Sequence, residues 1–157
     1  MAFENSDFAD TCEYSEFEKE NEYWLDDYSM YMAVKFHFDN QEWAKWDADI
    51  KARTPEAMGR YREELKEDIL FWKFCQFKFF EQWNKLRTYA NEKGIEMIGD
   101  IPIYVAMDSA DVWAHKDLFE LDEDFKQVNV AGVPPDAFSA DGQLWGNPLY
   151  NWQRMEE

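Results

Sequence analysis

The residue types that could bind a ligand are concentrated in one segment, 131–148. It holds a carboxylate, two amides and two aromatic rings, at Asp136, Phe138, Gln143, Trp145 and Asn147. Carboxylate and amide groups can hydrogen-bond to hydroxyls, while aromatic rings can stack on the apolar face of a sugar. A Pro–Pro step and several glycines would hold these groups on one loop. We therefore interpret the segment as a sugar-binding loop, because an ordinary packed loop would explain the rings but not the polar groups.

A further candidate is Asp100, which ends the short apolar segment 95–100 after a glycine at position 94. A helix, a glycine, an apolar strand and a polar strand end are typical of an α/β unit, so we expect a strand here. The carboxylate at the end of a parallel strand would point into an active site. Equally, it would cap the following turn. Both interpretations stay open from the pattern alone.

Metal and cofactor chemistry has little support in the sequence. Cys12, Cys75, His37 and His115 do not have the spacing of metal ligands. The acidic run 122–124 lacks the spaced ligands and central glycine of a calcium loop, so we expect a solvated turn. An acidic chain also offers many coincidental carboxylate pairs, and none stands out as a general acid and base. We expect no metal ion and no cofactor.

Composition narrows the possible partners. The 157 residues suffice for one domain of ordinary size, and the formal charge of -18 would repel nucleic acid and anionic lipid. There is no run of about 20 apolar residues that could span a membrane and no basic, apolar leader at the start. We therefore expect a soluble, cytoplasmic protein that binds neither nucleic acid nor membrane. The aromatic content of 18% is high, which suits a carbohydrate ligand without requiring one.

The first two thirds of the chain have helical periodicity. Apolar residues at spacings of three and four predict one or two amphipathic helices over 15–38 and a long helical pattern over 54–93. Thr54 would cap the second helix with Pro55 in its first turn, and Gly94 would end it. Because about forty residues is longer than most globular helices, we expect a break near residues 67 and 68.

Other elements follow from the remaining sequence. The stretch 69–83 is aromatic almost all round, so we expect that half of the helix to be buried on several sides.

In the connection 41–52, Trp43 and Trp46 would share a helical face. Asp108 and Ser109 favour a cap for a short helix. Beyond it periodicity fades, and we expect a long irregular loop with a functional role.

Longer motifs in the second half resemble the amylomaltase family of 4-α-glucanotransferases. The motifs are Gly99-Asp-Ile-Pro-Ile-Tyr-Val-Ala, Asp108-Ser-Ala-Asp-Val-Trp, Val130-Ala-Gly-Val-Pro-Pro-Asp and Gly142-Gln-Leu-Trp-Gly-Asn-Pro-Leu-Tyr. Upstream, 23–28 and 82–83 are similar to the helical segment of that family. The resemblance therefore covers the chain from about residue 15 onward.

The resemblance implies a fold and a reaction. The fold class would be mainly α with a small α/β part, as a fragment of a (β/α)8 TIM barrel with its inserted helical subdomain. Residues 1–14 would be a flexible N-terminal segment, 15–93 the helical subdomain and 94–157 a partial barrel segment with the glucan-binding loop. The family transfers α-1,4-glucan segments between maltooligosaccharides by a retaining mechanism that uses an Asp nucleophile, a Glu acid/base and a further Asp. These carboxylates follow the last matching motif, so we expect no catalytic residue within this chain and no activity from it alone.

Individual positions can be matched to the family. Asp100 matches an Asp near the donor sugar, and the residues that match the loop closing over the glucan are Asp136, Phe138, Gln143 and Trp145. Two positions depart from the pattern. Ala137 stands where the family usually has Tyr, so one stacking platform for the acceptor is missing. Phe125 stands where a Gly normally makes a turn, and we expect it to reshape a hairpin.

A partial barrel would leave apolar faces without their usual neighbours, so we expect a homo-oligomer, with the stretch 71–83 in its interface. The expected ligand is a maltooligosaccharide or another α-1,4-glucan. The alternative function, from a different class, is a non-catalytic helical protein-interaction module with an acidic surface.

Overall fold

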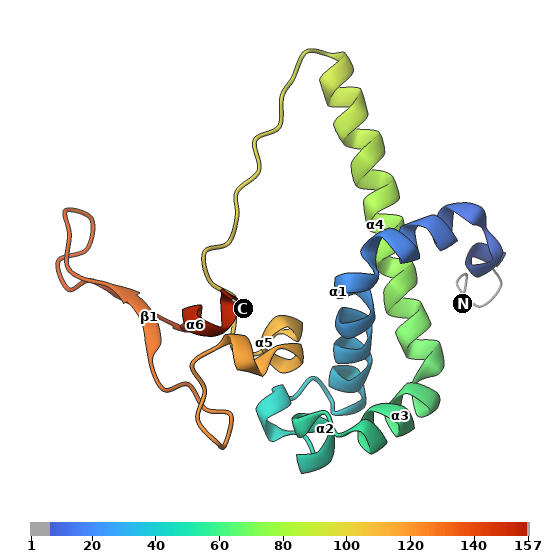
Figure 1. The fold of residues 1–157 in the computed structure, drawn as a ribbon. Helices are drawn as coiled ribbons and strands as arrows, with labels where there is room; N and C mark the ends of the chain where they lie inside the picture. Colours follow the sequence, from blue (N-terminus) through green and yellow to red (C-terminus); the bar gives the residue numbers. More distant parts are fainter. Residues whose placement is uncertain (1–6, 157) are drawn as a thin grey trace. The chain divides into compact units, whose positions relative to one another are not determined.

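The computed structural model describes residues 7–156 (Figure 1). The helices are α1 (Cys12–His37), α2 (Ala48–Ala52), α3 (Pro55–Glu64), α4 (Lys66–Glu92), α5 (Ala110–Ala114) and α6 (Trp152–Met155), with short 3-10 helices at Asp7–Asp10, Trp43–Lys45 and Lys116–Leu118. The strands β1 (Val130–Val133) and β2 (Gln143–Pro148) form an antiparallel sheet. The predicted flexible segment 1–14 lies partly outside the described residues. Its described part forms the first 3-10 helix and the start of α1.

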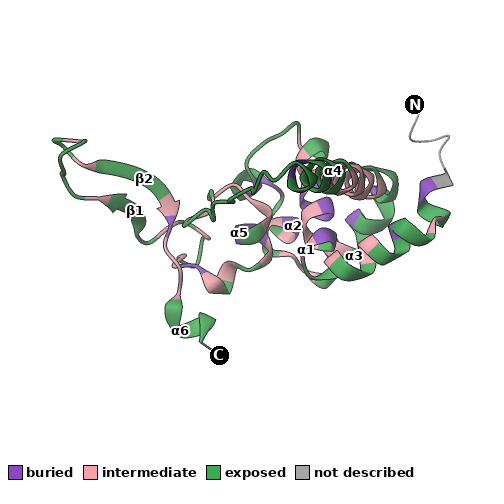
Figure 2. Cartoon of the chain, turned by 90° about the horizontal axis from the view of Figure 1, so that it is seen from above, coloured by how far each residue is buried: buried purple, intermediate pink, exposed green. Residues whose placement is uncertain are grey.

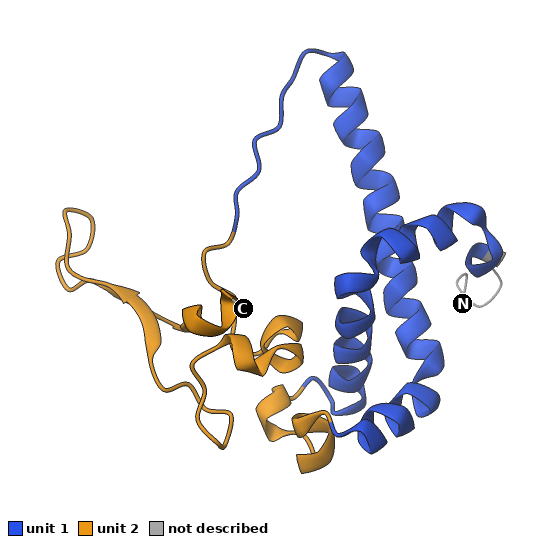
Figure 3. Ribbon diagram, viewed as in Figure 1, with its two compact units in different colours: residues 1–40, 54–101 blue, residues 41–53, 102–157 orange. Residues whose placement is uncertain are grey.

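The chain forms two compact units (Figure 3). The first, here called the helical unit, comprises residues 1–40 and 54–101. The second, the hairpin unit, comprises residues 41–53 and 102–157. No helix in the described range 7–156 is long and apolar enough to cross a membrane.

In the helical unit, α1 packs along α4 through aromatic rings. The ring of Phe17 lies 5.6 Å from the ring of Phe77 and 5.6 Å from that of Phe80. Phe36 contacts Trp72 edge to face at 5.2 Å. Such ring pairs add to the hydrophobic burial that holds two helices together. The amphipathic pattern of residues 15–38 is therefore confirmed as one long helix that begins a few residues earlier than expected.

The expected break in the second helical pattern is present, but earlier than predicted. Leu65 leaves helical geometry, with φ -106° and ψ 22°, and separates α3 from α4. Thr54 caps α3 by accepting a hydrogen bond from the Ala57 N–H, as its position before Pro55 predicts. Gly94 has a φ of +74°, the left-handed conformation that commonly ends helices.

The prediction that residues 69–83 are buried on several sides is wrong. Phe79 is 58% exposed and Trp83 is 38% exposed. Among the described residues, α4 is covered mainly along its face toward α1, with Phe8 of the first 3-10 helix on Phe74, and the remaining sides of the helix have no comparable neighbour. Among the described residues of α4, Ala90 is buried, with 7% of its surface exposed.

The predicted strand over residues 95–100 is also wrong. The segment runs as an irregular trace after α4 (Figure 1), and the side chain of Ile98 is 97% exposed. A strand is stabilised by hydrogen bonds to a neighbouring strand. Within residues 7–156, no segment pairs with this one. Residues 95–100 thus have the apolar sequence of a strand, but no strand among residues 7–156 pairs with them.

The core of the hairpin unit is built from tryptophans. Trp43 and Trp113 are completely buried, and Trp46 contacts Trp113 edge to face at 5.6 Å. The Trp43 Nε1–H donates to the Met107 carbonyl at 2.6 Å, and the Trp113 Nε1–H donates to the Ile50 carbonyl at 3.1 Å. These bonds tie residues 41–53 to the segment around α5. Figure 2 shows the contrast with β1, β2 and α6, which are largely exposed.

The segment after α5 is not the long irregular loop that the sequence predicted. Val130 pairs with Pro148, and Val133 pairs with Gln143, so the strands are joined by the connection 134–142. Between the Val130 and Gly132 pairs the register shifts, because β2 carries extra residues there. The error arose because β1 is only four residues long and rich in small side chains, which weakens the alternation that marks a strand. The Ser109 cap of α5 is confirmed, since its side chain accepts from the Val112 N–H.

Candidate functional site

The β1–β2 hairpin carries most of the residues predicted to bind sugar. Its two sides approach closely where Gly142 faces Val133 and Pro134, a point here called the neck. A Cβ atom placed on Gly142 would lie 2.5 Å from the carbonyl oxygen of Val133 and 3.0 Å from the carbonyl carbon of Pro134. Gly142 also has a φ of +72°, which disfavours any side chain at this position. The two sides of the hairpin therefore meet backbone against backbone below the tip.

Asp136 organises the tip of the hairpin. Its Oδ1 accepts hydrogen bonds from the N–H groups of Phe138 and Ser139, both at 2.8 Å. Its own N–H donates to the Ser139 carbonyl at 2.9 Å. These bonds satisfy backbone donors that would otherwise point into solvent, as carboxylates often do in turns. As a result Phe138 is held at the tip with 96% of its surface exposed.

Trp145 and Gln143 form a second polar and aromatic group on β2. The Trp145 Nε1–H donates to Gln143 Oε1 at 2.8 Å. The Trp145 side chain is 45% exposed, so part of its ring surface faces solvent. Its ring also contacts Tyr104 edge to face, with ring centres 6.1 Å apart. An accessible indole beside an amide can offer both stacking and hydrogen bonding to a sugar.

Asn147 connects the base of the hairpin to the preceding loop. Its Nδ2 donates to the Val105 carbonyl at 2.8 Å. Beside this bond, Tyr104 stacks on Tyr150, with ring centres 5.9 Å apart and an angle of 12° between the ring planes. Burial raises the pKa of Tyr150, and the nearby charge of Asp111 adds to the effect. Asn147 thus has a structural partner already, whereas the sequence had suggested a ligand contact.

Asp100 lies in the helical unit, in the irregular segment after α4. Its side chain is exposed, and its Oδ1 accepts a hydrogen bond from the Ile101 N–H at 2.9 Å. This is the local bond of a turn. Of the two interpretations that the sequence left open, the geometry of this carboxylate corresponds to the turn.

The structure brings the predicted residues together in pairs. Asp136 is bonded to the backbone of Phe138 at the tip, and Gln143 is bonded to Trp145 on β2. The sequence reasoning did not identify Tyr104 as a site residue. The sequence feature that could have indicated Tyr104 is its position in the motif 99–106, four residues after Asp100. That motif resembles the family, but the resemblance gave the tyrosine ring no role.

A second feature that the sequence reasoning missed is the environment of Lys116. Its Nζ donates to the Trp113 carbonyl at 2.6 Å and lies 5.3 Å from the Trp43 ring centre and 5.2 Å from that of Phe125. Burial lowers the pKa of Lys116 to about 8, and the charge of Arg53 contributes. Phe125 reaches this ring cluster from a tight turn, where its φ is +63°. Phe125 thus adopts the left-handed backbone conformation that favours glycine, although it carries a side chain.

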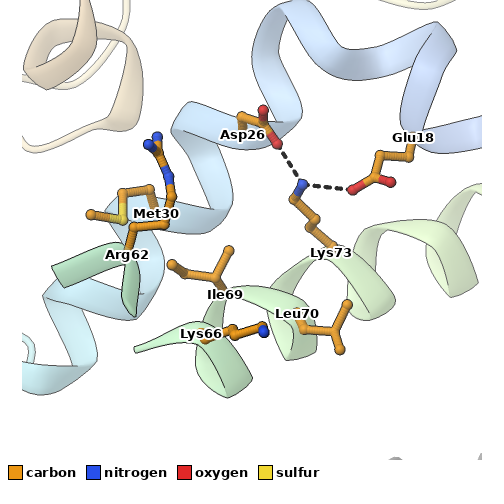
Figure 4. Close-up of a pocket in the computed structure, with 8 residues that line it drawn as sticks. All are labelled: Glu18, Asp26, Met30, Arg62, Lys66, Ile69, Leu70 and Lys73. Carbon is orange, nitrogen blue, oxygen red and sulfur yellow. Dashed lines mark hydrogen bonds and ion pairs between the residues drawn. The ribbon is translucent and has the colours of Figure 1, made fainter. Parts of the chain in front are cut away.

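The helical unit contains a separate concave region of about 320 Å³ between α1, α3 and α4 (Figure 4). Within it, the Lys73 Nζ lies 2.7 Å from Glu18 Oε1 and 2.5 Å from Asp26 Oδ1. Burial disfavours the charged form of Lys73, but the hydrogen bonds to Asp26 and Glu18 outweigh it and raise its pKa. These ion pairs join α4 to α1, so Lys73, Glu18 and Asp26 have a structural role.

Comparison with known proteins identifies the family. The family profile described as 4-alpha-glucanotransferase matches residues 1–157, so the chain belongs to that family and the resemblance is confirmed. It is 48% identical over 157 residues to the 4-alpha-glucanotransferase of Clostridium butyricum, covering 99% of this chain and 32% of that protein. It is 52% identical over 142 residues to the enzyme of Aquifex aeolicus, covering 90% and 29%.

A solved structure gives the same result. The amylomaltase from Streptococcus agalactiae in complex with acarbose matches with a TM-score of 0.84 and 47% identity, over 91% of this chain and 29% of that one. The chain therefore spans about a third of the length of its relatives, and its mainly helical fold with a small sheet corresponds to part of a larger enzyme. These matches do not favour the alternative of a protein-interaction module.

Proposed function

We propose that this chain is the part of a 4-alpha-glucanotransferase that contacts the glucan through the hairpin tip and β2. The whole enzyme would transfer α-1,4-glucan segments between maltooligosaccharides by a retaining mechanism. One observation carries the proposal. Phe138 and Trp145 present ring surface to solvent, 96% and 45% exposed, on a backbone held by side-chain hydrogen bonds and by a closed neck. Exposed rings carried on an ordered backbone are suited to stacking on sugars.

The rest of the enzyme forms part of the same proposal. The catalytic carboxylates would lie outside residues 1–157, and residues 94–157 would belong to a (β/α)8 barrel into which the helical segment 15–93 is inserted. Asp100 would contact the donor sugar. We also propose a cytoplasmic location and self-association of this chain through residues 71–83, which light scattering at micromolar concentration would test.

Calorimetric titration of this chain with maltoheptaose tests the binding proposal. We expect binding, and we expect Trp145→Ala and Phe138→Ala each to weaken it by about 2- to 10-fold, because each removes a stacking ring. The matched control is Tyr89→Ala, which removes an exposed ring from α4 outside residues 71–83 and should leave the affinity unchanged. Absence of binding, or equal weakening by the control, would contradict the proposal.

Incubation with maltotriose tests the placement of the catalytic groups. If they lie outside this chain, no glucose is released by it, even at concentrations at which maltooligosaccharide is bound. Release of glucose by the purified chain would show that a nucleophile and an acid/base lie within residues 1–157.

A further inference from the structure

We propose that Tyr104 is a positioning residue that fixes the orientation of the Trp145 indole for glucan stacking. The inference rests on the proposed function, because it gives Trp145 a sugar to stack on. It adds a residue to the site that the hairpin alone does not contain. Tyr104 lies 41 positions before Trp145 in the sequence and meets it only in the folded hairpin unit.

The Trp145 side chain needs such a neighbour because burial alone does not fix its orientation. Trp43 and Trp113 are completely buried and are held by the surrounding core. Trp145 has 45% of its surface exposed, so its rotamer depends on few contacts. Two are present. Gln143 accepts from its Nε1–H at 2.8 Å, and the Tyr104 ring lies edge to face against it at 6.1 Å.

Tyr104 is itself well anchored, which a positioning residue must be. It stacks on Tyr150 with nearly parallel planes, and Tyr150 packs against the buried ring of Phe119 at 5.3 Å. Next to it in the chain, the Val105 carbonyl accepts the hydrogen bond from Asn147 on β2. The position of the Tyr104 ring is thus coupled to the strand that carries Trp145 by both backbone and ring contacts.

The arrangement leaves the indole free to act. An edge-to-face contact occupies one part of the Trp145 surface, and the remaining exposed surface is available to an apolar sugar face. A ring that is ordered before the ligand arrives does not lose rotamer freedom on binding. Loss of Tyr104 should therefore weaken glucan binding without removing any group that touches the sugar.

The first test is a double-mutant cycle with maltoheptaose. We expect Tyr104→Leu, which removes the ring and keeps apolar bulk, to weaken binding by about 2- to 10-fold. Tyr104→Phe should bind like the unmodified chain, because the ring makes the described contacts. Tyr23→Leu, at a tyrosine that is 78% exposed on α1, is the matched control and should have no effect. In a Trp145→Ala background, Tyr104→Leu should cause no further loss. Additive losses would overturn the proposal, because Tyr104 would then act independently of Trp145.

The second test does not depend on a ligand. The chain is labelled with 5-fluorotryptophan, and the Trp145 signal is identified by its absence in Trp145→Phe. In Tyr104→Leu the fluorine signal of Trp145 should split or change in linewidth, because the indole then samples more than one rotamer, while those of Trp43 and Trp113 stay in place and show that the unit is folded. A Trp145 signal that only shifts, with its linewidth unchanged, reflects the lost ring alone and overturns the proposal. If the unmodified chain does not bind maltoheptaose, the proposed function fails, and the fluorine spectrum still decides whether Tyr104 orders Trp145.

Discussion

The hairpin unit uses the same residue type in two opposite ways. Trp43 and Trp113 are completely buried, and their indole N–H groups donate to carbonyls 64 and 63 residues away in sequence. Trp145 is 45% exposed, and its indole N–H donates to a side chain two residues away. A tryptophan becomes core where a distant segment supplies both apolar volume and a carbonyl. It stays accessible where its hydrogen-bonding partner is local.

The largest expected effect comes from truncating a core ring. Trp113→Ala should destabilise the hairpin unit by about 3 to 5 kcal/mol, because it leaves a cavity and removes the indole N–H that donates a hydrogen bond to the Ile50 carbonyl. Urea unfolding followed by the fluorine signal of labelled Trp43, in the same unit, measures the change. The matched hairpin substitution Phe138→Ala should change stability by less than about 0.5 kcal/mol, since that ring is 96% exposed. Similar losses from the two substitutions would contradict the contrast between core and hairpin.

A second, smaller effect should appear as a dependence on pH. The pKa of Lys116 is lowered to about 8 in the folded chain from an ordinary value of 10.5. Between these values the unfolded chain binds a proton that the folded chain has released, so the contribution of Lys116 to the free energy of unfolding rises with pH. This contribution is complete above pH 10.5 and is lost as the pH falls through 8. We expect a rise on the order of 1 to 2 kcal/mol, because water still screens part of the ammonium group.

Comparison with Lys116→Met isolates that contribution from the tyrosines and lysines that titrate in the same range. Urea unfolding of both proteins is measured from pH 7 to 10. The difference in unfolding free energy, unmodified chain minus variant, should increase with pH. A constant difference would mean that burial and the Arg53 charge do not lower the pKa of this lysine.

The smallest effect concerns the backbone of Phe125. Phe125→Ala loses the ring contact with Trp43 and keeps the left-handed φ of +63°. Phe125→Gly loses the same ring but releases the strain that a Cβ atom causes there. The Gly variant should therefore be about 1 kcal/mol more stable than the Ala variant in urea unfolding. Equal stability, or a more stable Ala variant, would show that the turn is not strained.

The sequence predicted the local elements of the fold well, because their causes are local. Thr54 and Ser109 cap helices through their own side chains, and Gly94 ends α4 through its own φ. The aromatic spacing in α1 likewise specifies which helix face packs, whereas the stretch 69–83 of α4 is aromatic almost all round and did not specify one. The break before α4 was expected from length alone, which explains why its position at Leu65 was missed.

Features that depend on distant residues could not be predicted in the same way. The apolar segment 95–100 would need a partner strand, which no local pattern supplies. The hairpin was missed because β1 has only four residues and its pairing with β2 joins residues on either side of the connection 134–142. In the candidate site, the exposed Phe138 and Trp145 were recognised by residue type, whereas Tyr104 joins them only through contacts across 41 positions.

The closed neck at Gly142 has a consequence for how this family member could diversify. The two sides of the hairpin meet backbone to backbone there, and above that point the Asp136 carboxylate orders the tip through the N–H groups of Phe138 and Ser139. Residues such as Ala137 and Phe138 can be exchanged while the frame beneath them stays in place. On the proposed glucan contact, we expect a mutational library confined to positions 137 and 138 to vary ligand preference, whereas any side chain at position 142 would meet the Val133 carbonyl and force the hairpin backbone to shift.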